Sequence, residues 1–180
     1  RLQTVSKLRI NDVNVDVGEE SDNDVGENDT IGDPAMVEDE VVFTIDVENL
    51  FSDTDDINIE DVKVNMLIEG IDDGDDIDED SEKKDIDKDS EESFEISFTV
   101  PLEADDKTYT ITITAEGDDE NGATHMATRM IKLEVEKEDD DLRITRSELG
   151  SQTILCGEST ALAVQIRNFG KDDQNEAALV

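Results

Sequence analysis

Alternating apolar and polar positions run through most of the first 136 residues and predict β-strands. The clearest run is 37–49 (VEDEVVFTIDVEN), where Val41, Phe43, Ile45 and Val47 alternate with Val42, Thr44, Asp46 and Glu48. A period of two, with β-branched and aromatic residues on one face, is typical of a half-buried antiparallel strand. The same test predicts strands at residues 7–17, 40–49, 57–68, 93–100, 108–115 and 127–135.

The layout of the 37–49 strand occurs a second time. Residues 156–170 (CGESTALAVQIRNFG) again join an acid-bearing turn to an alternating strand that ends in Asn and a large apolar residue. Upstream of the two strands, Leu-Arg-Ile occurs at 8–10 and again at 142–144. The repetition predicts one complete β module followed by the beginning of another.

Short strands separated by turn signals, with no convincing helical period, predict an all-β chain with an immunoglobulin-like antiparallel β-sandwich. The phase of the first strand changes between Ile10 and Val13, which predicts either a β-bulge or a strand that crosses between sheets. Tyr109 fits a tyrosine corner and equally an ordinary strand tyrosine. The expected division is an N-terminal arm at 1–6, the sandwich at 7–136 with an acidic insertion at about 71–92, a linker at 137–141, and a partial second module at 142–180.

The inward-facing side of the predicted strands gives a list of core residues. Each has a large, mainly apolar side chain and lies at one of the alternate positions that form the predicted buried face of its strand. The list is Phe43, Ile45, Val47, Val64, Met66, Phe94, Ile96, Phe98, Tyr109, Ile111, Leu133 and Val135.

The composition is strongly acidic, with 52 acidic and 15 basic residues and a net charge of −37. Nucleic-acid binding is not expected, because it needs basic patches that neutralise phosphate. The acids gather in the gaps between apolar runs, which favours a solvated surface suited to concentrated salt or a cation-rich exterior. No apolar run approaches the ~20 residues of a membrane helix, so we expect no direct membrane insertion in this segment.

Six short segments carry a resemblance to a known family: 157–158 (GE), 47–49 (VEN), 166–168 (IRN), 68–70 (IEG), 90–100 (SEESFEISFTV) and 109–113 (YTITI). Their pattern resembles the immunoglobulin-like modules repeated in archaeal and bacterial surface proteins, above all the CARDB type, named for cell adhesion, and archaeal surface-layer proteins. The chain departs from that pattern at 106–107 (DK), where the family often has Gly before the tyrosine, and in its acidic insertion. The resemblance implies an extracellular structural or adhesive role at the cell surface and brings no catalytic residues.

Candidate catalytic groups are few. The single histidine, His125, is expected at an exposed turn or strand edge, and the single cysteine, Cys156, as a small buried residue at a strand entrance. Neither has a partner of the right type nearby in sequence for nucleophilic or metal chemistry. We therefore expect no enzyme activity.

Calcium is the one ligand with a physical case, because it takes six to eight oxygen ligands. A run of acids around Gly74 offers such oxygens without the spacing of an EF-hand, although a solvated charge run is the more common explanation of such a sequence. The acids at the module junction offer a second set. Asn28 begins the only N-x-S/T sequon, a candidate glycosylation site in a loop. The candidate calcium ligands are Asp72, Asp73, Asp75, Asp76, Asp78 and Asp80 in the first set, and Glu136, Glu138, Asp139, Asp140 and Asp141 in the second.

The expected function is a structural component of an extracellular surface layer or filament built from tandem modules, stabilised by cations. The alternative is an adhesin or carbohydrate-binding sandwich whose loops contact a ligand. Expected partners are copies of itself or other surface-layer subunits. The second module shows only its first strands, so we expect its sandwich to be completed either by downstream residues or by a strand of a neighbouring subunit.

Overall fold

The computed structural model describes residues 5–151, 153, 155–157 and 159–177. It divides into two compact units, unit 1 (Arg1–Glu136) and unit 2 (Lys137–Val180). The described residues form strands and no helix, and none could span a membrane as a long apolar helix. The strands of unit 1 are β1 (Leu8–Val17), β2 (Glu20–Asp22), β3 (Ala35–Met36), β4 (Glu40–Asn49), β5 (Ile59–Asp72), β6 (Asp75–Asp80), β7 (Lys84–Ile86), β8 (Glu91–Thr99), β9 (Lys107–Asp119) and β10 (Thr124–Glu136); those of unit 2 are β11 (Leu142–Leu149) and β12 (Leu162–Asn168).

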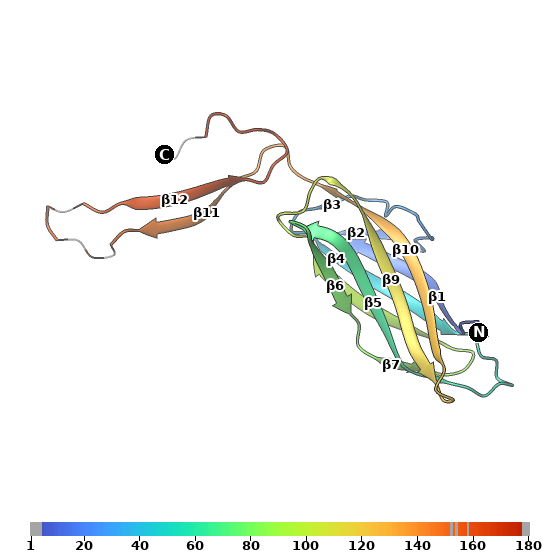
Figure 1. The fold of residues 1–180 in the computed structure, drawn as a ribbon. Coiled ribbons are helices and arrows are strands. Elements are labelled where there is room, and N and C mark those ends of the chain that lie inside the picture. The colour runs from blue at the N-terminus through green and yellow to red at the C-terminus, as the bar shows by residue number, and fades with distance from the viewer. Residues whose placement is uncertain (1–4, 152, 154, 158, 178–180) are drawn as a thin grey trace. The chain divides into compact units, whose positions relative to one another are not determined.

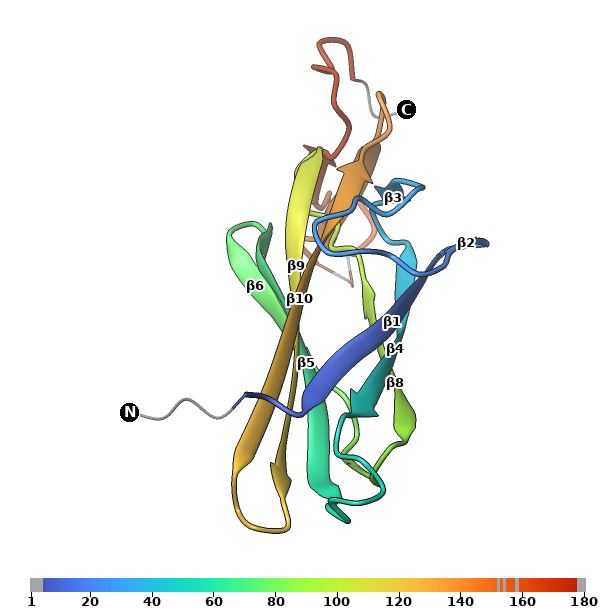
Figure 2. The same ribbon diagram turned by 90° about the vertical axis from the view of Figure 1, so that its right-hand side faces the viewer.

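Unit 1 is an immunoglobulin-like β-sandwich, as predicted. One sheet has the order β2-β1-β4-β8 and the other the order β3-β10-β9-β5-β6, with β7 also paired to β5. The two layers face each other in Figures 1 and 2. Every strand pairing in unit 1 is antiparallel except β3 with β10, and the isolated bridge between Thr30 and Lys132 is parallel too. In immunoglobulin terms β1, β4 and β8 take the places of strands A, B and E, and β5, β6, β9 and β10 those of C, C′, F and G.

The predicted core lies between these sheets. All twelve predicted core residues are buried, none more than 7% exposed. Phe43 of β4 and Phe98 of β8 stack with their ring centroids 6.2 Å apart. The inward-facing side chains of the alternating strands therefore form one continuous apolar layer between the two sheets.

The phase change in β1 is a β-bulge. The pairing of β1 with β4 shifts register between Ile10 and Asp12, while β1 stays in one sheet throughout. The half-buried Arg129 of β10 donates to the carbonyl oxygens of Ile10 at 2.9 Å and Asn11 at 3.4 Å. The arginine side chain thus ties the bulge to the opposite sheet and supplies hydrogen-bond donors for the carbonyl groups of the bulge.

Tyr109 forms a tyrosine corner, one of the two roles that its position in the sequence allowed. Its hydroxyl oxygen accepts a hydrogen bond from the backbone N–H of Asp105 at 2.9 Å, and its ring is buried. Such a bond back to the chain a few residues upstream is the geometry of the corner in immunoglobulin-like sandwiches.

The acidic segment 71–92 differs from the expectation of an insertion without strand structure. Residues 73 and 74 form the turn of a hairpin in which Asp72 pairs with Asp75, and the chain continues through β6 and β7 into β8. Ile71 and Ile86 are fully buried in the main core. The sequence of β6 shows no alternation of apolar and polar positions, because β6 is an edge strand whose acidic side chains are exposed on both faces.

Unit 2 repeats the antiparallel β1–β4 strand pair of unit 1, whose two strands are separated in the chain by β2 and β3. Leu142 lies opposite Asn168 as Leu8 lies opposite Asn49, and the register shifts between Ile144 and Arg146 as it does between Ile10 and Asp12. The described residues of unit 2 hold these two strands, which correspond to the beginning of a second module.

The β1–β4 and β11–β12 strand pairs also end in the same hydrogen-bonded turn. The side-chain oxygen of Asn49 accepts from the backbone N–H of Phe51 at 3.0 Å, and that of Asn168 accepts from Gly170 at 3.1 Å. A Cβ on Gly170 would lie 2.6 Å from backbone atoms of residues 139 and 141, so unit 2 needs glycine here, whereas Phe51 takes the equivalent position of the turn in unit 1. The repeat thus extends from the sequence to its backbone geometry.

Cys156 is not the buried strand-entrance residue that was expected. It is exposed, in the connection between β11 and β12 rather than at the start of a strand. The strand begins only at Leu162, so the apolar environment expected for the thiol is missing at this position.

Candidate functional site

The first set of candidate calcium ligands lies along the β5–β6 hairpin. Asp72 ends β5, Asp73 is in the turn, and the other four lie on β6 with exposed side chains. Alternate residues of a strand point to the same face, so Asp76, Asp78 and Asp80 share one face of β6 and Asp75 points to the other. The carboxylates of the shared face contact cross-strand donors: Asp76 accepts from the Gly70 N–H at 2.7 Å, Asp78 and Asp80 both accept from the Asn65 amide, and Asp80 also contacts Lys63.

The second set follows the end of β10, where Glu136 is the last strand residue. The Asp141 carboxylate accepts from Nε of Arg143 at 2.9 Å and from its Nη2 at 2.8 Å. The carbonyl oxygens of Glu138 and Asp139 accept from the N–H groups of residues 171 and 172. Throughout the part of the chain that the structure describes, no three His, Cys, Asp or Glu side chains form a group that could hold a metal ion. Calcium binding at either set stays a prediction.

Asn28 lies in an exposed turn with its backbone in the left-handed region, at φ 65°. Its backbone N–H donates to the carbonyl of Met130 at 2.7 Å, which fixes the turn against β10. The exposed side chain leaves room for a glycan, and its occupancy stays a prediction.

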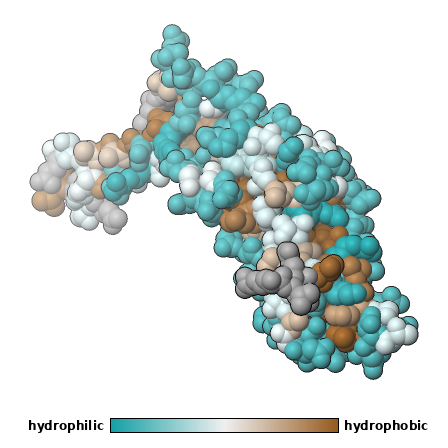
Figure 3. Space-filling view, turned by 45° about the vertical axis from the view of Figure 1, so that its right-hand side comes forward, coloured by the Kyte–Doolittle hydropathy of each residue, from teal (hydrophilic) through white to brown (hydrophobic). Residues whose placement is uncertain are grey.

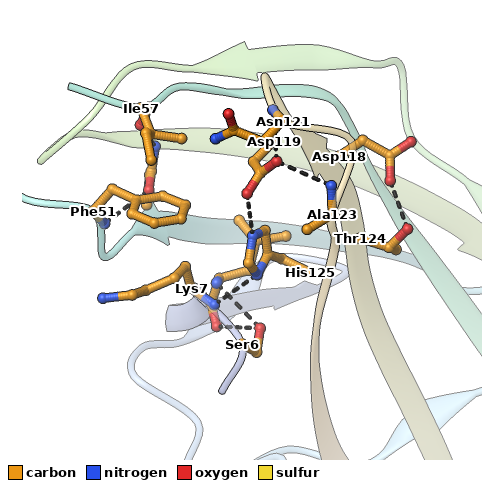
Figure 4. Close-up of polar contacts among 12 residues, drawn as sticks. Ser6, Lys7, Phe51, Ile57, Asp118, Asp119, Asn121, Ala123, Thr124 and His125 are labelled. Carbon is orange, nitrogen blue, oxygen red and sulfur yellow. Dashed lines mark hydrogen bonds and ion pairs between the residues drawn. The ribbon is translucent and has the colours of Figure 1, made fainter. Parts of the chain in front are cut away.

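His125 is buried, contrary to the expectation of an exposed edge residue. It is 3% exposed and points into the end of the sandwich from the start of β10 (Figure 4). Its Nδ1 accepts the backbone N–H of Lys7 at 3.1 Å, and its Nε2 lies 3.2 Å from Oδ2 of Asp119. Because Nδ1 accepts a hydrogen bond from the Lys7 backbone N–H, Nε2 is the ring nitrogen that donates a hydrogen bond to Asp119.

Asp119 is buried beside the imidazole and closes the β9–β10 turn. Its Oδ1 accepts the backbone N–H groups of Asn121 at 2.8 Å and Ala123 at 3.0 Å. The Ala123 hydrogen bond, with those from His125 and Asn121, lowers the pKa of Asp119 from its usual 3.8 against the opposing effect of burial. The carboxylate therefore stays ionised and serves both the turn and the histidine.

The same cluster attaches the chain just before β1 to the opposite sheet. Ser6 Oγ accepts the backbone N–H of Met126 at 3.1 Å, and the Phe51 ring lies edge-on to the imidazole at 5.4 Å. The Ser6 hydroxyl also bonds to Leu8 and has no hydrogen bond to His125 among the contacts of this cluster. The arrangement lacks the nucleophile–base contact of a hydrolase and acts as a structural latch. We call Ser6, Lys7, Phe51, Asp119 and His125 the His125 latch.

Changing Asp119 to asparagine is expected to lower stability at neutral pH and to make stability less sensitive to acid. The depressed pKa means that Asp119 stabilises the fold above its unfolded pKa, and that this contribution is lost as the pH falls through the folded value. Urea unfolding of both proteins between about pH 7 and about pH 2 should show their midpoints converging as the pH falls. A difference that stays constant across this range would contradict the role of the ionised carboxylate.

Comparisons with known proteins agree with the fold. No protein-family model matches the chain, and no curated protein matches it. Among solved structures, the C-terminal domain of Wzt matches with a TM-score of 0.55 at 14% identity, over 74% of this chain and 76% of that one. This likeness supports the β-sandwich and shows the fold alone.

Two further solved structures match more weakly. A family 123 glycoside hydrolase from Clostridium perfringens has a TM-score of 0.43 at 16% identity, over 63% of this chain and 23% of that one. The sporulation control protein Spo0M from Bacillus subtilis has a TM-score of 0.36 at 13% identity, over 90% of this chain and 69% of that one. Likenesses at this level carry no functional inference.

Proposed function

We propose that the chain is part of an extracellular structural protein, a surface layer or filament built from tandem immunoglobulin-like modules. The observation that carries the proposal is the repeated strand pair: β1–β4 and β11–β12 share their register, the position of their bulge and their terminal Asn turn. A chain that repeats one module in series builds an extended object from small folded units. The resemblance to CARDB-type and surface-layer modules supports the same role.

The acidic surface supports a cation-rich exterior as the working environment. Hydrophilic side chains cover much of the face of unit 1 drawn in Figure 3. Most of the 52 acids lie in unit 1, where their mutual repulsion opposes folding unless cations screen it. An adhesin or sugar-binding module remains the alternative. The polar hollow lined by Asp61, Lys63, Lys83, Glu116, Gly117 and Asp118 has no aromatic side chain in its lining on which a sugar ring could stack.

Immunogold electron microscopy of the source cells tests the proposed function. Antibodies raised against unit 1 are expected to label the cell exterior in a regular array or along filaments. Labelling of the cell interior would overturn the extracellular role. Sparse exterior labelling of single particles would favour the adhesin instead.

Divalent cations are expected to raise the melting temperature more than sodium does at matched ionic strength. Screening by any salt relieves the self-repulsion at −37, whereas a bound calcium ion adds mass-action stabilisation. Thermal melts in calcium, in calcium with chelator and in sodium chloride separate the two effects. Asp75→Asn with Asp78→Asn, and separately Asp139→Asn with Asp140→Asn, assign the effect to the hairpin or the junction. Equal shifts in calcium and sodium would leave screening alone.

A further inference from the structure

The outer face of the sheet that holds β10, β9 and β5 carries an uncharged area, although 37% of the residues in the chain are charged. The three strands lie side by side (Figure 1), and two rows of outward side chains cross them, one through Thr114 and one through Thr112 of β9. Neither row contains a charged residue. The first row is Thr128, Thr114 and Asn65, and the second is Met130, Thr112 and Leu67. We call these six residues the neutral face.

The outer face of the opposite sheet is acidic instead. Asp12 of β1 lies opposite Asp46 of β4, and Glu48 of β4 lies opposite Glu91 of β8. At a net charge of −37, two copies of the chain repel each other wherever such faces approach. The neutral face adds nothing to this repulsion, and it carries Met130, a large apolar residue that is 43% exposed. It is therefore the better of the two outer faces for contact with a second copy.

A base and an acid flank the neutral face at one end, on opposite sides of β9. Lys132 of β10 lies opposite Thr110 of β9. Glu69 of β5 belongs to the same row, because the residue before it, Ile68, lies opposite Ile111. Among the ion pairs within the described part of the chain, none involves Lys132 or Glu69. Across the sheet this row therefore reads base, hydroxyl, acid.

We propose that a second copy of the chain covers the neutral face, in a symmetric dimer of unit 1. A two-fold axis that runs parallel to the strands and passes over β9 lays β10 of one copy on β5 of the other. The two sheets then pack face to face with their strands aligned to within about 30°. The pairs brought together are Met130 with Leu67, Thr128 with Asn65, and Lys132 with Glu69, each formed twice. Uncharged side chains thus meet uncharged ones, and each lysine meets a glutamate.

The other acids on this side of the sheet lie at the rim of the contact. Glu116, the next outward residue of β9 beyond Thr114, lies opposite Lys63 of β5 in the same copy. Asp78 and Asp80 lie on β6, beyond β5, where both accept hydrogen bonds from the Asn65 amide. The rim acids therefore have donors or a lysine beside them and leave the centre of the face uncharged.

The dimer is expected to be weak, because the net charge of each copy opposes association. A dissociation constant on the order of 10–100 μM is typical of a small, transient contact. The dilute chain, as used for the unfolding experiments, is then monomeric. The dimer goes beyond the proposed surface role, since it depends on unit 1 alone and holds whether or not that role is correct. Sedimentation tests the dimer, and microscopy tests the role.

Sedimentation velocity of the 180-residue chain from about 1 μM to about 1 mM measures the association. Sodium chloride at about 1 M shortens the Debye length to about 3 Å and screens the net charge, so dimer is expected in the upper part of this range. Thr112→Glu places two carboxylates opposite each other at the axis and should weaken the dimer by about tenfold or more. Thr44→Glu is the matched control, because Thr44 is also a half-buried threonine on the outer side of an interior strand, β4, of the other sheet. It changes the net charge equally and should associate like the unaltered chain.

A charge swap tests the arrangement of the two copies, at about 0.15 M salt where charges are screened less. Lys132→Glu and Glu69→Lys, made singly, bring like charges together and should each weaken the dimer about fivefold. Glu69→Lys separates this effect from net charge, because it makes the chain less negative and would strengthen association if net charge alone mattered. The double variant restores both pairs with their signs exchanged, and should associate within about twofold of the unaltered chain.

Three results would overturn the proposal. The first is a chain that stays monomeric up to about 1 mM at both salt concentrations. The second is equal association of Thr112→Glu and Thr44→Glu, which would place the contact between copies on another surface. The third is a double variant that associates no better than the single ones, which would mean that Lys132 does not meet Glu69.

Discussion

Replacing Phe43 with alanine is expected to lower the free energy of unfolding of unit 1 by about 3–5 kcal/mol. Phe43 is fully buried at the middle of β4 and stacks on Phe98 across the sheet. Its removal leaves a cavity between two sheets whose strands are fixed by many backbone bonds, so the site collapses poorly. Tyr109 is the only tyrosine and tryptophan is absent, so its fluorescence reports the unfolding of unit 1 by urea.

Met130→Ala is the control for this measurement, since Met130 is exposed and its loss should change stability by less than about 0.5 kcal/mol. A Phe43→Ala protein as stable as this control would mean that Phe43 does not lie in the core. The placement of β4 between β1 and β8 would then be wrong.

Replacing Asn49 with leucine is expected to cost about 3 kcal/mol, because it removes the side-chain partner of one buried and two part-buried backbone groups. Asn49 is fully buried, and its side-chain amide donates to the carbonyls of Ile57 at 3.2 Å and Ile86 at 3.1 Å. Its oxygen accepts from Phe51, so one side chain joins the end of β4 to the next loop and to β7. Leucine has about the right volume and none of these contacts.

Asn168→Leu is the matched control, because Asn168 ends the equivalent strand with the same turn but is exposed. Urea unfolding followed by far-ultraviolet circular dichroism, which reports the strands of both units, should show almost no change for Asn168→Leu. Equal losses for the two variants would show that the amide network at Asn49 contributes nothing beyond the turn itself.

The strands with one buried face could be predicted from their sequence. For β4, β8 and β9 the period of two extends over the whole strand, because one side faces the core and the other faces water. The bulge in β1 was also visible, since an extra residue shifts the parity of every apolar position after it. The β11–β12 pair could be predicted because its sequence repeats the apolar pattern of β1 and β4.

The hairpin within 71–92 could not be predicted from alternating apolar positions, because β6 is exposed on both faces and has acidic residues on both. A local signal was present: Asp73-Gly74 is a dipeptide that favours a two-residue hairpin turn, and both residues have positive φ, 50° and 97°. The long-range pairing that buries Ile86 against β5 has no local signature at all.

The burial of His125 was also signalled. It shares the odd parity of Ile131, Leu133 and Val135, which face the core on the same strand. The imidazole was nevertheless expected at an edge, because one of its two hydrogen-bond partners is distant in the chain. Asp119 lies six residues upstream across the β9–β10 turn, but Lys7 is 118 residues away, so the contact that covers the ring at Nδ1 arises only from the tertiary fold.

The register of the β11–β12 hairpin tests the central claim, that unit 2 repeats the β1–β4 strand pair of unit 1. Nuclear Overhauser effects between backbone protons report which residues lie opposite each other on antiparallel strands. The repeat predicts cross-strand contacts that join Ile144 to Ile166 and Arg146 to Gln165, with Thr145 bulged out between them. Continuous pairing through Thr145, or a register displaced by one residue, would turn the apolar face over and contradict the repeat.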